Sequence, residues 1–290
     1  MKLGRLSKFG QHFSVVFHNN HAYRLHSPSG FEDRPMESWL AEPEALKSAA
    51  KAAIDQGEAI EFEEADLLPP VAAPRKILGI ALNYLDHARE TGREPPERQT
   101  WFVKQVTALN APYGVIEMPK VSDRLDYEAE LVVVIGRGGR HIPADRADEV
   151  IAGYTCGNDV SVRDWQRATP TMIMGKGFDT HAPVGPWIIT PDELGGPNTL
   201  GLRTIINGDV RQNGNTSDLI HKIPEMIAHL SAAFTLEPGD LIFTGTPAGV
   251  AVAHDPPKFM KTGDRVRVEI DGIGHIEHVV EDEAGTIQIG

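Results

Sequence analysis

Residues 124–138 read RLDYEAELVVVIGRG and contain the clearest strand in the chain. The apolar run over 129–136 has the length and the β-branched content of a buried strand, and a glycine ends it. Successive strand residues point to opposite faces, so Glu128 and Glu130 share one face. Burying two carboxylates costs several kcal/mol each unless a positive group pairs with them. The stretch therefore predicts either a salt-bridged strand end facing solvent or a site for a hard divalent cation, which prefers oxygen ligands.

Around this stretch, strand signals are many and helix signals are few. Asn207-Gly208 and Asp271-Gly272 lie between apolar runs and indicate hairpin turns. Helices are predicted over 223–234 and over 144–154. Strand-length apolar runs occupy 76–82, 129–136, 185–190, 202–208, 240–245 and 265–272. This pattern predicts a β-rich α+β fold with a rolled or sandwiched sheet.

The first part of the chain has its own signals. Two short strands are predicted around the turn at 18–20, and an alanine-rich helix over 42–58. The proline-rich stretch LLPPVAAPRK at 67–76 indicates a connection, because proline donates no backbone hydrogen bond. We therefore expect a small N-terminal α/β domain over 1–72 and a larger, β-rich domain over 73–290.

Charge and cysteine content limit the partners and the location. The 290 residues carry a formal net charge of −13 and no basic stripe, which argues against a nucleic-acid partner. Cys156 is the single cysteine, so no disulfide within the chain is possible, and we interpret it as a buried structural thiol. No apolar run approaches a membrane span, and the first residues lack the apolar core of a signal peptide. We expect a cytoplasmic protein.

A third acid would complete a metal site. Asp159 lies in CGNDVSVRDWQRATP, near a predicted strand end. Three carboxylates with three waters or substrate oxygens form an octahedron suited to Mg²⁺ or Mn²⁺. Taken alone, Asp159 could equally be a turn residue or a helix cap.

Three further patterns could bear chemistry. His87 and Glu90 are three residues apart on a predicted helical turn, which suits either a general base oriented by an acid or an ordinary surface pair. Lys176 lies between two glycines, where it could stabilise an oxyanion or lie in solvent. The glycine-rich turn TGTPAGV, which contains Thr246, can present hydrogen-bond donors to an anion.

Together these segments resemble the fumarylacetoacetate hydrolase family. The matching pieces occur in the family's order and span residues 75–282. They are LNYLDHARE, DYEAELVVVIG, GYTCGNDVSVRDWQ, GKGFDTHAPVGPW, LEPGDLIFTGTPAGV and GDRVRVEIDGIG. The resemblance implies the family's mixed β-sandwich roll with a small N-terminal domain, the catalytic domain over 73–290, and a homodimer.

The resemblance also implies roles for nine residues of this chain. The ligands to Mg²⁺ or Mn²⁺ would be Glu128, Glu130 and Asp159. The catalytic residues would be His87, Glu90 and Lys176. The substrate-binding residues would be Arg163, Gln166 and Thr246. Family members that cleave fumarylacetoacetate carry a further acidic ligand upstream of the histidine. The corresponding stretch of this chain, ILGIALNY, has no acid, which favours the acylpyruvate hydrolase-like branch.

The expected activity is hydrolysis of a C–C bond in a 2,4-dioxo acid of acylpyruvate type. The products would be pyruvate, or a related oxo acid, and a carboxylic acid, as part of a catabolic route. Two alternatives stay open: an oxaloacetate decarboxylase or oxo-acid tautomerase or isomerase of the same family, and a non-catalytic, metal-stabilised binding protein. The charged segment over 88–100 could close over substrate as a lid. The expected partner is a small oxo acid, with neither nucleic acid nor membrane.

Overall fold

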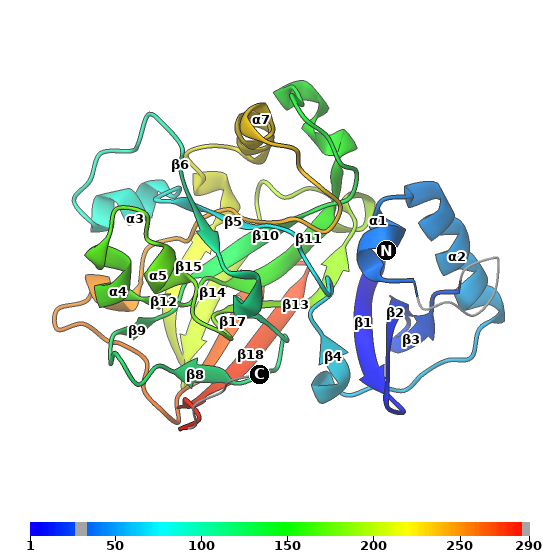
Figure 1. Cartoon of the computed structure of the whole chain (residues 1–290), viewed down its shortest axis with the longest axis horizontal. Helices are drawn as coiled ribbons and strands as arrows, with labels where there is room; N and C mark the ends of the chain where they lie inside the picture. The colour runs from blue at the N-terminus through cyan, green and yellow to red at the C-terminus, as the bar shows by residue number, and fades with distance from the viewer. Residues whose placement is uncertain (27–33, 286–290) are drawn as a thin grey trace.

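The computed structural model describes residues 1–26 and 34–285 as an α+β fold built on two sheets (Figure 1). Eleven strands of these described residues form the larger sheet. Their order is β3 (His21–Arg24), β2 (Gln11–His18), β1 (Lys2–Lys8), β13 (Ala182–Ile189), β11 (Ile151–Asn158), β10 (Ala129–Ile135), β16 (Leu241–Phe243), β5 (Ile77–Ala81) and β6 (Thr100–Lys104), with β4 (Leu67–Leu68) beside β1 and β7 (Leu109–Asn110) beside β13.

The second sheet packs against the larger one. Its five strands run in the order β15 (Asp209–Asn215), β14 (Gly201–Ile206), β17 (Arg265–Ile270), β18 (Gly274–Asp282) and β8 (Ile116–Met118). Leu131 of β10 and Val268 of β17 belong to one buried cluster, so the main core lies between the two sheets. A short pair of strands, β9 (Leu125–Asp126) and β12 (Ser161–Val162), lies beside them. This sandwich is the β-rich α+β fold that the sequence predicts.

Helices cover the sheets and connect the strands. Helix α2 (Pro43–Gln56) begins with proline and buries a face at Leu46, Ala49, Ala50 and Ala53, the spacing of a single helical stripe. The other helices are α1 (Met36–Leu40), α3 (Leu85–Glu90), α4 (Arg163–Ala168), α5 (Ile173–Lys176), α6 (Pro191–Leu194) and α7 (Ile223–Ala233), with 3₁₀ turns η1 (Glu64–Asp66), η2 (Val106–Ala108), η3 (Ala144–Glu149), η4 (Thr216–Asp218) and η5 (Ala251–Ala253).

The helix predicted over 144–154 is wrong in its second half. A 3₁₀ turn ends at Glu149, and β11 begins at Ile151. Strand β11 pairs with β10 on one side and with β13 on the other. These long-range pairings outweigh the local helical signal. The predicted turns are confirmed: Asn19 and Asn20 connect β2 and β3 with φ of 48° and 64°, and β17 and β18 form a hairpin.

The N-terminal segment joins the rest of the molecule through β1. Lys2 and Leu3 pair with Ile189 and Ile188 of β13, which places β1–β3 in the larger sheet. Leu3 also shares a buried cluster with Val132 of β10. Figure 1 shows these blue elements with α1 and α2 on one side of the molecule. The division into domains at residue 72 stays a prediction.

Two further sequence expectations concern burial and membranes. Cys156 is fully buried, as a structural thiol would be. Within the described residues, no helix combines the length and the apolar character needed to span a bilayer.

Candidate active site

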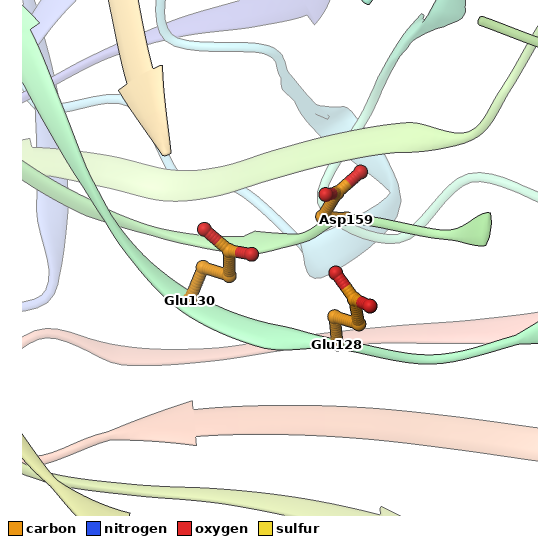
Figure 2. A group of neighbouring side chains, drawn as sticks. All are labelled: Glu128, Glu130 and Asp159. Carbon is orange, nitrogen blue, oxygen red and sulfur yellow. The ribbon is translucent and has the colours of Figure 1, made fainter. Parts of the chain in front are cut away.

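Pairing of β10 with β11 brings the three predicted metal ligands together. Glu130 stands opposite Gly157, and the backbone N–H of Asp159 donates to the carbonyl of Glu128 over 2.9 Å. Single carboxylate oxygens of the three acids lie within 4.8 Å of one another, and Figure 2 shows the side chains gathered around one space. We refer to Glu128, Glu130 and Asp159 as the acid triad.

The acid triad is buried and paired with protein cations. Its side chains belong to residues only 6%, 1% and 0% exposed, which excludes a strand end facing solvent. Lys176 Nζ lies 2.7 Å from Glu128 Oε2 and 2.5 Å from Asp159 Oδ2. Arg163 Nη2 lies 2.6 Å from Glu128 Oε1. The alternative of a lysine in solvent is therefore wrong as well, because Lys176 is 2% exposed.

Two charged residues at the site were not singled out from the sequence. Lys104, at the end of β6, is buried and donates from Nζ to Asp159 Oδ1 over 2.6 Å. Asp126 lies 2.7 Å from Arg163 Nε and also accepts the backbone N–H of Ala251. Asp126 is two residues before Glu128, so strand alternation could have indicated it, whereas Lys104 reaches the site only through tertiary packing.

The pKa values of Glu128 and Glu130 are shifted in opposite directions. Burial acts to raise the pKa of Glu128, but the charges of Lys176 and Arg163 outweigh burial and hold that pKa below its ordinary value. Burial raises the pKa of Glu130 well above its ordinary value, and the charges of Asp159 and Glu128 raise it further. Glu130 Oε2 accepts the backbone N–H of Gly245 over 2.6 Å, but no salt bridge among the described residues includes Glu130.

The acid triad fits a divalent cation. Three carboxylates are a hard oxygen donor set of the kind that Mg²⁺ and Mn²⁺ prefer. Glu130 forms no ion pair within the described residues and lies beside two other acids, so a bound cation would supply the positive charge that this carboxylate lacks.

The predicted catalytic pair lies beside the acid triad. His87 and Glu90 are on α3, with His87 Nδ1 2.9 Å from Glu90 Oε2. Glu90 Oε1 accepts the backbone N–H of Gly249 over 2.8 Å, so the acid is held on both oxygens. With Nδ1–H donating to Glu90, Nε2 of His87 carries the free lone pair of a general base. We refer to His87 and Glu90 as the dyad.

A cavity of about 320 Å³ joins the dyad to the acid triad. It is lined by seven of the nine predicted side chains: His87, Glu128, Glu130, Arg163, Gln166, Lys176 and Thr246. The other two do not line the cavity but contact residues that do: Glu90 contacts His87, and the fully buried Asp159 contacts Lys176. The volume suits a small metabolite rather than a polymer.

Close helix packing places the polar residues around this cavity. A Cβ on Gly175 would fall 2.1 Å from the backbone nitrogen of Gln166, so the glycine before Lys176 lets α5 approach α4. Gln166 Oε1 accepts from Arg163 Nη1 over 2.9 Å. Thr246 donates its hydroxyl to the carbonyl of Ala129 over 2.8 Å, so its predicted contact with substrate stays a prediction.

The chain is similar over most of its length to proteins of one family. The sequence model of a protein family, described as fumarylacetoacetate (FAA) hydrolase, C-terminal, matches residues 76–281. A mitochondrial oxaloacetate tautomerase of Xenopus laevis is 40% identical over 248 residues, which are 84% of this chain and 78% of that protein. The predicted cytoplasmic location therefore stays a prediction.

Solved structures give the same result. Maleylpyruvate hydrolase from Sphingobium sp. SYK-6, in complex with manganese(II) and pyruvate, is 32% identical, with a TM-score of 0.82. A 5-carboxymethyl-2-hydroxymuconate delta-isomerase from Mycobacterium smegmatis is 34% identical, with a TM-score of 0.78. Each comparison covers 98% of this chain and 100% of the other. The predicted roll is confirmed, whereas the homodimer stays a prediction.

Proposed function

This chain belongs to the fumarylacetoacetate hydrolase family, and from that premise we propose that it is a divalent-metal-dependent enzyme whose leading activity is keto–enol tautomerisation of oxaloacetate. The observation that carries the proposal is that His87 of the dyad lines the same cavity as Glu128 and Glu130 of the acid triad. A general base beside a cation site can remove a proton from the carbon next to a carbonyl group, because the cation stabilises the enolate that forms. The tautomerase name of the 40% identical relative favours oxaloacetate.

Mg²⁺ or Mn²⁺ would be held by the acid triad. When bound, the cation would act as a Lewis acid that stabilises negative charge on the 2-oxo group of the substrate. The manganese complex of the maleylpyruvate hydrolase supports this assignment.

The dyad would transfer the proton. Nε2 of His87 takes a proton from C3 of the keto form, the C–H electron pair becomes the C2=C3 bond, and the 2-oxo oxygen gains the negative charge. The imidazolium then returns the proton to that oxygen, so the enol forms with no net gain or loss of protons. Glu90 holds the imidazole in the required tautomer and stabilises its charged form. Lys176 and Arg163 add positive charge near the developing oxyanion.

Hydrolysis of an acylpyruvate is the second candidate. The same dyad could take a proton from water, which would then attack the distal carbonyl of a 2,4-dioxo acid. The 32% identity to a maleylpyruvate hydrolase is the observation that favours it. Decarboxylation of oxaloacetate would use the cation site alone, because it needs no base.

A panel of reactions tests the proposal. With Mn²⁺ or Mg²⁺, the protein should speed decay of the enol absorbance of oxaloacetate without releasing pyruvate. Decarboxylation would release pyruvate from oxaloacetate, and hydrolysis would place ¹⁸O from labelled water in the carboxylate of the acyl product. Absence of enol turnover together with ¹⁸O incorporation from an acylpyruvate would replace the leading activity with the second. Tight oxo-acid binding without any turnover would indicate a binding protein.

A further inference from the structure

Two of the three arginines that line the cavity, Arg93 and Arg167, make no ion pair with any residue that the structure describes. Arg163 and Lys176 also line it, but their positive groups already contact acidic side chains. Arg93 and Arg167 are exposed, and within the described parts of the chain neither side chain makes an ion pair or a hydrogen bond. In a chain of net charge −13, two uncompensated cations at one cavity are a local reversal of charge.

Arg167 is placed by helix geometry. It follows Arg163 by four residues on α4, so both side chains are on the same helix face. Four residues at about 1.5 Å each separate them by about 6 Å along the axis. Arg163 is buried at the acids and Arg167 is exposed, so this face of α4 leads from the acid triad to the cavity mouth.

Arg93 is placed by the end of the helix that carries His87. The N–H of Gly92 donates to Arg89 O over 3.0 Å, and the N–H of Arg93 donates to Ala88 O over 2.9 Å. These two bonds, with Gly92 at φ +66°, form a Schellman motif at the C-terminus of α3. The motif places Arg93 directly after the helix that carries the dyad.

We propose that Arg93 and Arg167 form a subsite for a second carboxylate, so that the cavity selects 2-oxo dicarboxylates over 2-oxo monocarboxylates. The planar guanidinium fork matches a carboxylate. The proposal rests on the proposed function in one respect: the 2-oxo end of the ligand lies at the acid triad. The distal carboxylate then extends toward the mouth, where the two arginines are.

Two probes of equal carbon number test this subsite by binding alone. Calorimetric titration of the Mn²⁺-loaded protein compares 2-oxoglutarate with 2-oxopentanoate, which lacks the second carboxylate. Two exposed ion pairs together should give the dicarboxylate about a tenfold lower Kd. The preference should shrink to within about twofold in the Arg93→Gln/Arg167→Gln variant. It should also weaken as salt is raised, because both arginines are exposed.

The charge-matched control is Arg89→Gln/Arg98→Gln, which removes two exposed arginines that do not line the cavity. The control should keep the wild-type preference. Wild-type protein that binds the two probes equally, or binds neither, overturns the subsite. So does a preference that survives in the Arg93→Gln/Arg167→Gln variant or disappears in the control. A preserved preference in a protein without enol turnover supports the subsite and refutes only the proposed function.

Discussion

Two buried histidines away from the dyad should make the fold sensitive to acid. His181 and His278 are 1% and 2% exposed. The Nε2–H of His181 donates to Glu117 O over 2.8 Å, and that of His278 donates to Ala111 O over 3.1 Å. In both rings Nδ1 has no partner among the described residues, so a second proton would have no acceptor. Burial accordingly lowers the pKa of each histidine to about 4.

The sign of the effect follows from the lowered pKa. An unfolded histidine has a pKa of about 6.5, so between pH 6.5 and 4 the unfolded chain binds more protons than the folded one. The stabilising contribution is complete above about pH 6.5 and is lost as the pH falls toward 4. At pH 5, about 1.5 pH units below the unfolded pKa, each histidine should cost the fold about 2 kcal/mol. Both together should cost about 4 kcal/mol, a large part of an ordinary stability of about 5–15 kcal/mol.

Urea denaturation at pH 7.5 and pH 5 measures this loss, with EDTA present so that metal binding contributes nothing. His181→Gln and His278→Gln keep a side-chain N–H for the same carbonyl but cannot titrate. Each should reduce the loss of unfolding free energy between the two pH values by about 2 kcal/mol. His229→Gln, on the exposed face of α7, should leave the loss unchanged. Equal losses in the wild type and in the two buried-site variants would refute the reasoning.

Three further predictions concern the active site. EDTA should abolish turnover, and added Mg²⁺ or Mn²⁺ should restore it. Alanine at any one acid of the triad should remove metal binding from a folded protein, and full activity in a metal-free sample would contradict this prediction. His87→Ala should lower kcat by about 10²–10⁴-fold while keeping its Mn²⁺ affinity, with His229→Ala as the unaffected control; a loss below tenfold would argue against a general base. Amides over 88–100 should gain protection from hydrogen exchange when oxalate binds, because this mostly exposed segment would close over the cavity; unchanged exchange at saturation would count against a lid.

Local patterns predicted the parts of the site that depend on strand alternation. Glu128 and Glu130 share a face because successive residues alternate, and that face continues into Val132 and Val134 of the buried core. Leu131 and Val133, on the opposite face of β10, belong to the other buried cluster. A strand buried on both faces is what the apolar run indicated.

The remaining parts depend on contacts between distant segments. Lys104 reaches Asp159 across 55 residues, and nothing in the sequence around it distinguishes a buried lysine from a surface one. The pairing of β1 with β13 joins residues about 187 positions apart. The end of an element can also be predicted wrongly: the helix expected over 144–154 is a 3₁₀ turn that ends at Glu149, and β11 begins at Ile151. The hydrophobic periodicity of one segment does not indicate which distant segment it will contact.

The register between β10 and β11 limits how this chain can change length. Inserting or deleting one residue at Ala129 would turn every following side chain of β10 to the opposite face, so Glu130 would no longer share a face with Glu128 and would exchange places with a core residue. The pairing does contain an irregularity, between Val134 and Ile135 at the end of β10 away from the acid triad. Length variation should therefore be tolerated at that bulge. Between Glu128 and Glu130, even one added glycine should abolish the site.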